Sequence, residues 1–380
     1  MTLLLSLVAR FVRAHPIPHA PGPLSHILVV DLNFLGDMLL ASPVFRALRQ
    51  AFPNARIDAL VYEIAAPAVR INPFLDHVHT IAARSVWGGF RTGLLMRRER
   101  YDLVCQLNTS LLVNTLLWTI GSRLRLGYDY RHRGCLLNIR VPIAARTARM
   151  GRRTDECVEL LERAFGLTIP DRSMIFPVSD ASRRRVALLL TEAGIGPGDV
   201  LIGMHVNCRQ GRALRRWDAS RFAELGRLLL ERHAVRLVFT GGAEDGPYIQ
   251  TITSRTGSPE RILVAAGRVS FEDLGALLER LTVFVTLNTG PMHIAVAVGT
   301  PTVAIIGGTP AAVVYPRDDD RFRYVEDPAL QSWDPGSGRM RVPSALNSIT
   351  PADVLAQVEA LLHAGAGRGG SPSEHVHTEG

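Results

Sequence analysis

Short apolar runs alternate with segments of helical periodicity along the first half of the chain. The apolar runs predict buried strands, and the periodic segments predict helices. The predicted strands are 26–31, 55–61, 77–81 and 101–107. The predicted helices are 38–51, 62–71, 90–99, 111–120 and 154–165. Strands that are apolar throughout and separated by helices are typical of a parallel sheet covered on both faces.

The second half repeats this alternation after a segment of different composition. Residues 170–185 carry prolines, serines and a run of arginines, and they predict a linker between two domains. The predicted strands beyond it are 199–206, 235–242, 261–267, 282–288 and 300–307. The predicted helices are 218–232, 246–256, 270–281 and 290–298. The whole pattern predicts an α/β protein with two doubly wound, Rossmann-like domains.

A length of 380 residues suits two domains of ordinary size. We expect an N-terminal domain and a C-terminal domain, followed by a closing helix and a Gly/Ser-rich tail that is disordered. The expected parts are an extension (1–25), the two domains (26–172 and 173–345), the closing helix (346–364) and the tail (365–380).

The N-terminal run "MTLLLSLVARFVRAHP" (1–16) leaves two interpretations open. Arg10 interrupts the apolar residues too early for the run to span a bilayer, and the features of a signal peptide are missing. One interpretation is an amphipathic helix on a membrane, with Arg10 and Arg13 facing anionic head groups. The other is an extension that packs on the domain or moves freely.

The charge balance favours acidic partners. All 43 basic residues are arginine, and the formal net charge is +8. Residues 131–153 concentrate this charge, either as a patch that faces an anionic acceptor or as a solvated surface, and the solvated surface is the commoner case. The arginines of this stretch are Arg131, Arg133, Arg140, Arg146, Arg149, Arg152 and Arg153. Few aromatic residues and no recognised module argue against a specific nucleic-acid partner.

The cysteines and acidic residues give no sign of a metal centre. Cys105, Cys135, Cys157 and Cys208 are far apart, without the spacing of a metal site, which favours a reduced, cytoplasmic protein. The acidic run "RDDDR" (317–321) is expected to be a solvated loop. We therefore predict no metal.

Polar clusters follow the predicted strands, where doubly wound sheets bind their ligands. Asp37 comes after the first strand, at the start of a helix. In the second half, "HVNCRQGRALRRW" (205–217), "TGGAED" (240–245) and "LNTGPMH" (287–293) each follow a strand. No GxGxxG motif follows a predicted strand, and no GxxxxGK[ST] motif is present, so a dinucleotide dehydrogenase or a P-loop NTPase is not expected.

The last of these clusters suits a phosphate group. Thr289 can cap the helix that follows, and Gly290 lets a ligand approach the backbone. Free N–H groups at a helix start, with the macrodipole behind them, bind phosphate. The ordinary alternatives are a cap alone for Thr289 and a core or capping role for His293.

The other two clusters complete a nucleotide diphosphate site. The Gly241–Gly242 turn can also approach phosphate, and Glu244 is placed to accept hydrogen bonds from ribose hydroxyls. Arg215 and Arg216 add positive charge, although each is also an ordinary surface residue. Because all these groups follow strands of one sheet, we favour the binding site over the separate ordinary roles.

Long motifs in both halves resemble one family of glycosyltransferases. "GDMLLASPVFRALRQAFPNARIDALV" (36–61) and "NPFLDHV" (72–78) resemble the N-terminal signature of the ADP-heptose:lipopolysaccharide heptosyltransferases, glycosyltransferase family 9. "RRWDASRFAELG" (215–226) resembles the family's Lys-x-Trp-Pro segment. "NTGPMHIAVAVGTPTVAIIG" (288–307) resembles its Asp-[Ser/Thr]-Gly-x-x-His helix, and "LNSITPADVLAQVEALL" (346–362) its closing helix.

The resemblance, which covers about residues 26–310, implies the GT-B fold, with an acceptor-side domain and a donor domain facing each other across a cleft. It implies an inverting, metal-independent transfer of heptose from ADP-heptose to an anionic glycolipid, the lipopolysaccharide inner core. No cofactor is implied, because the nucleotide sugar is a substrate. In this family Asp37 would be the general base, although a carboxylate at a helix start is also favoured by the dipole alone. Arg215 and the helix start would stabilise the leaving diphosphate.

The same resemblance assigns the remaining donor residues. Asn207 and Cys208 match positions near the phosphates, and Val269 would lie near the adenine. Thr289, Gly290 and His293 would surround the diphosphate and the sugar. The same motif contains Asn288 and Pro291.

Three departures from the family pattern affect the donor side. Asn288 stands where the family has Asp, and Arg215 stands where it has Lys, with a different reach and geometry. Asn207 and Cys208 replace a pair of hydroxyl residues in part. These departures keep two alternatives open: a family member with another nucleotide sugar or with a secondary metabolite or protein as acceptor, and a weakened enzyme that acts as a sugar-nucleotide-binding scaffold. We expect a cytoplasmic protein, with peripheral contact to the inner membrane left open.

Overall fold

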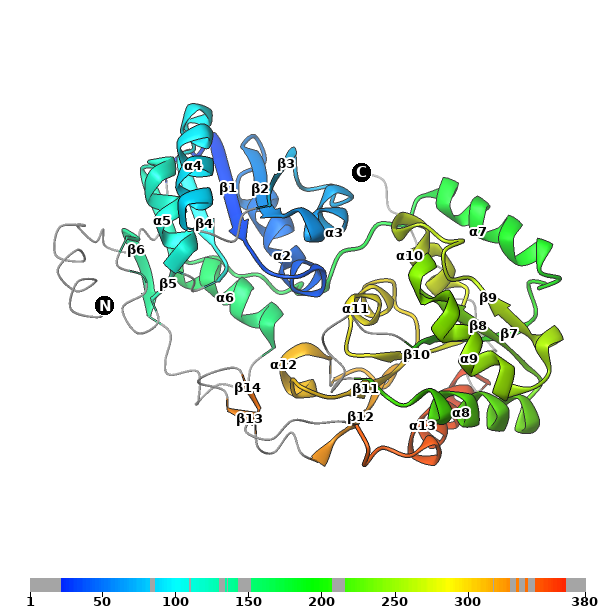
Figure 1. Ribbon diagram of the computed structural model, residues 1–380. Coiled ribbons are helices and arrows are strands. Elements are labelled where there is room, and N and C mark those ends of the chain that lie inside the picture. The colour runs from blue at the N-terminus through cyan, green and yellow to red at the C-terminus, as the bar shows by residue number, and fades with distance from the viewer. Residues whose placement is uncertain are drawn as a thin grey trace. The chain divides into compact units, whose positions relative to one another are not determined.

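The chain forms two compact units, each built around its own sheet (Figure 1). The first unit runs to Val178 and the second begins at Ser179, while Ala312–Tyr315 and Asp334–Arg339 belong to the first. The computed structural model describes residues 22–82, 86–108, 111–129, 134, 136–142, 152–206, 216–316, 318–328, 333–334, 339–340 and 346–366.

The first unit contains a six-stranded parallel sheet of order β3-β2-β1-β4-β5-β6. Val29 of β1 pairs with Ala59 on one side and Cys105 on the other. The strand order reverses between β1 and β4, so this is the switch point where such sheets bind ligands. The strands are β1 (His26–Asp31), β2 (Arg56–Tyr62), β3 (His77–Ile81), β4 (Leu103–Gln106), β5 (Leu124–Asp129) and β6 (Ile139–Pro142).

Helices cover both faces of this sheet. Leu28 and Val30 pack in one apolar cluster with Met96 of α4 and Leu116 of α5. Side chains alternate along a strand, so Asp31 points to the opposite face, where α2 and α6 pack together. The helices are α2 (Leu35–Ala51), α3 (Ala66–Arg70), α4 (Val86–Met96), α5 (Leu111–Ile120) and α6 (Arg153–Phe165), with short turns η1 (Glu63–Ala65) and η2 (Arg97–Glu99).

The segment between the units is only partly the linker that the sequence predicts. Its beginning is tied to α2, because the Ile175 amide donates to Ser42 Oγ at 2.8 Å and Arg46 donates to the Asp171 carbonyl at 2.8 Å. Helix α7 (Asp180–Glu192) then starts inside the predicted linker, with Ser179 accepting a hydrogen bond from the Ser182 amide. The linker prediction is wrong there because the arginines lie on a largely exposed helix face, which resembles a polar loop in sequence.

The second unit contains a six-stranded parallel sheet of order β12-β11-β10-β7-β8-β9, which reverses between β7 and β10. Its strands are β7 (Val200–His205), β8 (Val235–Thr240), β9 (Ile262–Val264), β10 (Val283–Leu287), β11 (Thr302–Ile306) and β12 (Phe322–Glu326). Strands β13 (Trp333–Asp334) and β14 (Arg339–Met340) form a separate pair. The other elements of the second unit are α8 (Ala219–Arg232), η4 (Ala243–Asp245), α9 (Gly246–Thr256), η5 (Pro259–Arg261), α10 (Phe271–Glu279), α11 (Gly290–Ala297) and α13 (Pro351–Ala366). The short helix α12 (Ala311–Val314) follows β11 in sequence but belongs mostly to the first unit.

A buried tryptophan joins the second unit to its last helix. Trp217 packs edge-on against Phe222 with 4.8 Å between ring centroids, and its Nε1 donates to the Ile349 carbonyl at 2.9 Å. Val354 and Leu355 of α13 belong to the same apolar cluster. The Trp of the motif therefore fastens the C-terminal helix to the sheet.

The predicted apolar strands are present in both sheets, but three peripheral strands escaped prediction. β5, β6 and β12 each mix buried positions with arginine, tyrosine or glutamate. β6 and β12 lie at sheet edges, where one flank faces no further strand of the sheet, so their sequences lack a continuous apolar run. Among the described residues, no helix has the length and apolar character needed to cross a membrane.

Candidate active site

Asp37 lies in the first turn of α2, directly after the carboxyl end of β1. Its Oδ2 accepts a hydrogen bond from the Phe34 amide at 3.2 Å, and the side chain is half-buried. A carboxylate at this position is favoured by the positive end of the helix dipole. The sheet reverses its strand order at this edge, so the predicted base lies where a ligand of this unit is expected.

A buried ion pair lies behind Asp37. Asp31, the last residue of β1, binds Arg153 of α6 with 3.1 Å between Oδ2 and the guanidinium NH2. Asn33 Nδ2 donates to Asp31 Oδ1 at 2.6 Å, and Glu156 Oε2 lies 3.8 Å from Arg153 NH1. Arg153 Nε is buried and has no hydrogen-bond partner among the described residues. Arg153 is thus no solvated charge, and the expectation of a solvated surface for residues 131–153 is wrong for it.

The electrostatics of this pair extend to Asp37. Burial raises the pKa of Asp31 to about 6, against the lowering effect of Arg153 and with a further rise from the charge of Asp37. Burial also raises the pKa of the Cys157 thiol to about 12, so a neutral thiol packs beside the pair. The carboxylates of Asp31 and Asp37 and the guanidinium of Arg153 thus lie close together near the start of α2.

Two amide oxygens at the same edge lack partners. Gln106 ends β4 and donates from Nε2 to Asn114 Oδ1 at 3.2 Å, while its Oε1 is buried without a hydrogen bond among the described residues. The same holds for Asn108 Oδ1. A Cβ at Gly127 of the neighbouring β5 would come within 2.4 Å of Gln106 Cγ, so the glycine leaves room for this side chain. Buried acceptors of this kind are suited to sugar hydroxyls, which can donate to them.

In the second unit, a tight turn follows β8. The Gly242 amide donates to Asp245 Oδ2 at 2.8 Å, and Gly267, with φ of +72°, packs against Ala243. A Cβ at Gly242 would lie 2.4 Å from Glu244 Oε2, so the exposed Glu244 carboxylate lies directly over this glycine. The structure thus brings the predicted residues Gly241, Gly242 and Glu244 into one turn beyond the sheet.

The predicted phosphate-binding segment begins α11 beyond β10. Thr289 is the N-cap, but its Oγ1 donates to the Leu287 carbonyl at 3.3 Å and makes no side-chain cap. Asn288, Thr289, Gly290 and Pro291 are all half-buried. His293 points inward from the first turn of the helix, with Nδ1 buried and unpartnered among the described residues. Val269 lies half-buried in the loop before α10.

Two histidines at this sheet are uncharged at neutral pH. Burial lowers the pKa of His293 to about 4. Burial also lowers the pKa of His205, the last residue of β7, to about 4, although Asp245 opposes this shift. His205 Nδ1 lies 3.1 Å from Thr240 Oγ1. Each ring therefore offers a hydrogen bond rather than a positive charge to a ligand.

Replacing His293 with asparagine should weaken the acid sensitivity of folding. The unfolded histidine binds a proton below about pH 6.5, whereas the folded one resists it until about pH 4. The contribution of the neutral His293 to the free energy of unfolding is therefore fully present above pH 6.5. It is lost as the pH falls toward 4, by roughly 3 kcal/mol for a pKa shift of this size. In urea unfolding, the free energy of unfolding of H293N should fall less between pH 7 and pH 4 than that of the parent protein. The exposed His363 on α13 supplies the matched control H363N, and equal slopes for both variants would contradict the prediction.

A match to a family model over most of the chain identifies the family. A family model described as glycosyltransferase family 9 (heptosyltransferase) matches residues 90–320, which is more than half of the chain. The chain belongs to glycosyltransferase family 9. It is therefore a glycosyltransferase enzyme, as the sequence motifs predicted.

Three of the similar proteins align with this chain over nearly their whole length. Lipopolysaccharide heptosyltransferase 3 of Escherichia coli is 28% identical over 346 residues, covering 87% of this chain and 97% of that protein. The family 9 glycosyl transferase from Veillonella parvula matches with a TM-score of 0.75 at 21% identity, covering 91% of this chain and 99% of that one. The ADP-heptose lps heptosyltransferase II of E. coli matches with a TM-score of 0.70 at 20% identity, covering 90% and 99%. The predicted GT-B fold is confirmed.

Other predicted donor residues of this family 9 transferase have different positions. Asn207, Cys208 and Arg215 lie outside the described residues. Arg216 is half-buried, with its guanidinium carbon 5.5 Å from the centroid of the Tyr248 ring. This cation–π contact holds Arg216 against α9 and leaves its role in donor binding a prediction.

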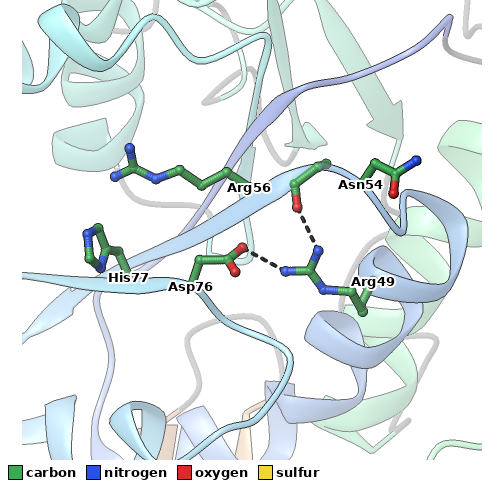
Figure 2. A pocket seen from close by; sticks show the side chains of 6 residues that line it. Arg49, Asn54, Arg56, Asp76 and His77 are labelled. Atoms are coloured by element: carbon green, nitrogen blue, oxygen red, sulfur yellow. Dashed lines mark hydrogen bonds and ion pairs between the residues drawn. The ribbon is translucent and has the colours of Figure 1, made fainter.

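A pocket elsewhere in the first unit is unsuited to catalysis (Figure 2). It has a volume of about 480 Å³ and lies where β2 and β3 begin, at the sheet edge opposite Asp37. Both arginines that line the pocket already form hydrogen bonds or ion pairs with neighbouring residues. Arg49 donates to Asp76 Oδ2 at 2.6 Å and to the Ala55 carbonyl at 2.6 Å, as Figure 2 shows, and Arg56 pairs with Asp58 at 2.9 Å. The contacts of Arg49 tie α2 to the segments that precede β2 and β3.

The described residues contain no group of three or more His, Cys, Asp or Glu side chains that could hold a metal ion. Within the acidic run, Asp319 binds Arg321 at 2.7 Å. The run therefore includes an internal ion pair, and metal independence of the reaction stays a prediction.

Sequence reasoning missed the polar groups that surround the two switch points. Asp31 and Gln106 each end a strand, and that position was the available signal. His205, which also ends a strand, lay in the predicted cluster 205–217 but was given no role there. Arg153 had no such signal, since it lies 122 residues from Asp31 in sequence.

Proposed function

We propose that this enzyme transfers heptose from ADP-heptose to the inner core of lipopolysaccharide with inversion at the anomeric carbon. The position of Asp37 at the switch point of the first sheet carries the chemical part of the proposal. The relatives support the substrates, since one is named a lipopolysaccharide heptosyltransferase and another an ADP-heptose lps heptosyltransferase.

Asp37 acts as the general base in this proposal. The acceptor hydroxyl attacks the anomeric carbon and gives its proton to the Asp37 carboxylate, while the bond from that carbon to the diphosphate oxygen breaks. ADP leaves with the bonding electron pair. One displacement of this kind inverts the configuration and needs no covalent intermediate on the enzyme.

The second unit stabilises the departing diphosphate in this proposal. The Gly290 amide at the start of α11 and the dipole of the helix meet the negative charge that grows on the phosphates. Pro291 has no N–H group, and the Met292 amide already donates to the Thr289 carbonyl at 3.1 Å. The Gly241–Gly242 turn lets the backbone approach the nucleotide, and Glu244 accepts hydrogen bonds from the ribose. These groups and the arginines replace a metal, so we propose that the transfer is metal-independent and uses no cofactor.

A second candidate function is the same type of transfer with another donor sugar or another acceptor. The half-buried Asn288 stands where the family motif has Asp, so the site has one negative charge fewer beside α11. A donor sugar with a different hydroxyl pattern, or a non-lipopolysaccharide acceptor, would suit such a change. N288D should shift the ratio of activities toward ADP-heptose if the alternative donor is correct, and should leave the preference unchanged otherwise.

Replacing Glu244 with alanine should weaken ADP binding about tenfold, because a charged acceptor of ribose hydrogen bonds is lost. Calorimetric titration with ADP measures the dissociation constant directly. E260A removes another carboxylate of the same unit and is the matched control. An unchanged constant for E244A would show that Glu244 does not hold the ribose.

The proposed lipopolysaccharide acceptor indicates the subcellular localisation that we expect. A lipopolysaccharide core that is still being built is a membrane-anchored, anionic glycolipid. We propose that the enzyme is cytoplasmic and works at the cytoplasmic face of the inner membrane.

A further inference from the structure

Four large apolar side chains stand exposed on two neighbouring helices of the first unit. On α4 they are Trp87, Leu94 and Leu95, with exposed fractions of 79%, 45% and 62%, and on α5 it is Trp118, with 53%. Together they form what we call the α4–α5 face. Single exposed apolar residues are ordinary, but a group that includes two tryptophans marks an interaction surface.

The spacing on α4 gathers these residues on one side. Trp87, Leu94 and Leu95 stand at positions i, i+7 and i+8, and Arg91 at i+4 lies on the same stripe. Arg98 follows in the short turn η2. The ring of Trp87 is held edge-on to Phe90 at 6.1 Å between centroids. The buried side of the helix carries Gly93 and Met96. Solvent therefore meets a stripe in which apolar and arginine side chains alternate.

Close packing makes the two helices one surface. A Cβ at Gly93 would lie only 1.8 Å from Thr119 Oγ1, so α4 approaches the α5 side chains as closely as glycine allows. Thr119 Oγ1 donates to the Leu116 carbonyl at 2.8 Å, so this hydroxyl group has its hydrogen bond within α5. Figure 1 shows α4 and α5 side by side against the first sheet. Trp118 thus lies exposed on the helix that packs directly against α4, next in sequence to Thr119 at the contact.

The charge around the face has one sign. Arg91, Arg97, Arg98 and Arg123 are exposed and form no ion pair among the described residues. Glu99 is the one acidic residue in the sequence ranges 86–100 and 111–125, and it is half-buried and pairs with Arg56 at 3.2 Å. An apolar surface accompanied by arginines that form no ion pair within the described part of the chain matches an anionic apolar boundary.

We propose that the α4–α5 face docks on an anionic lipid bilayer. Tryptophan and leucine side chains enter the boundary between head groups and acyl chains, where amphipathic tryptophan rings are favoured. The arginines contact lipid phosphates, whose surface potential attracts them. The link to the reaction rests on the proposed function, since the membrane that carries a glycolipid acceptor would be the one bound.

The docking is tested by vesicle flotation of the full-length protein without donor or acceptor. The protein should float with vesicles of phosphatidylglycerol and phosphatidylcholine, remain behind with phosphatidylcholine alone, and detach as salt is raised. The variant W87S/L95S should lower the bound fraction at least tenfold. The variant R91Q/R98Q should weaken binding and reduce its salt dependence. L188S is the matched control, because Leu188 on α7 of the second unit is 64% exposed and should not matter.

A second measurement reports the face directly. Phosphatidylglycerol with brominated acyl chains should quench tryptophan fluorescence in the parent, and W87F should show less quenching. Undiminished vesicle binding by W87S/L95S would overturn the proposal and assign binding to another segment, such as residues 1–21. Concentration-dependent dimers that W87S/L95S abolishes, seen by sedimentation without vesicles, would also overturn it, because a second copy would then cover the face.

The outcome separates docking from the proposed reaction. W87S/L95S should transfer sugar to a delipidated, water-soluble acceptor with unchanged kcat/KM, and should lose at least tenfold with the acceptor embedded in anionic vesicles. Vesicle binding without any heptose transfer would refute the reaction and leave the docking in place. Transfer without vesicle binding by the parent would refute the docking alone.

Discussion

Replacing Asp37 with asparagine should lower kcat about a thousandfold, because a general base of this kind contributes two to four orders of magnitude. The amide can still accept the hydrogen bond from the Phe34 N–H group, so the start of α2 should be preserved. Binding of ADP-heptose should therefore be unchanged. Initial-rate kinetics and calorimetric titration of the same preparation measure the two quantities.

Glu63 supplies the matched control for this experiment. It begins η1 directly after β2, so it is an exposed carboxylate at the same edge of the same sheet. E63Q should keep the parental kcat within about twofold, as expected for an exposed carboxylate that is not the base. A D37N enzyme with nearly normal turnover would remove Asp37 from the mechanism and leave it as a helix-start residue.

Replacing Arg153 with methionine should lower the free energy of unfolding by roughly 3–5 kcal/mol at pH 8, since the change leaves the Asp31 carboxylate buried without its partner. The double variant D31N/R153M removes both charges and should recover most of the loss. Urea unfolding of the parent, both single variants and the double variant gives the coupling between the two residues. Additive losses would mean that the ion pair does not act as a unit.

The same pair should shape the pH profile of the enzyme. Burial raises the pKa of Asp31 to about 6, so the folded protein binds a proton there that the unfolded chain does not hold above about pH 4. This group therefore favours folding at low pH, and its contribution declines as the pH rises from 4 through 6. Below pH 6 the loss of its charge changes the field at Asp37. A break in kcat/KM near pH 6 should thus disappear in D31N.

Sequence patterns predicted the central strands because these are buried on both faces and apolar throughout. β1 and β10 are examples, with nearly every residue buried. The peripheral β6 and β12 include charged residues, Arg140 in β6 and Arg323 and Glu326 in β12, so local pattern does not separate them from loops. Helix α7 was not predicted, because its exposed arginines likewise resemble a polar loop in sequence.

The candidate site was predictable where it depends on local geometry. The glycines after β8, the start of α11 and Asp37 at the start of α2 all follow strands, and parallel topology gathers strand ends. The Asp31–Arg153 pair was not predictable, because it joins residues 122 positions apart through tertiary packing. The position of the Gln106 side chain likewise depends on the space that Gly127 leaves in the neighbouring strand. The roles of Asn207, Cys208 and Arg215 stay predictions from the family resemblance.

The most direct test is a transfer reaction with defined substrates. The purified protein would be incubated with ADP-heptose and a deacylated inner-core acceptor, with chelator present, and the product examined by mass spectrometry and by NMR of the new anomeric centre. The account predicts a gain of one heptose residue, an anomeric configuration opposite to that of the donor, and no effect of chelator. Transfer from GDP-mannose or UDP-glucose in preference to ADP-heptose, or retention of configuration, would contradict it.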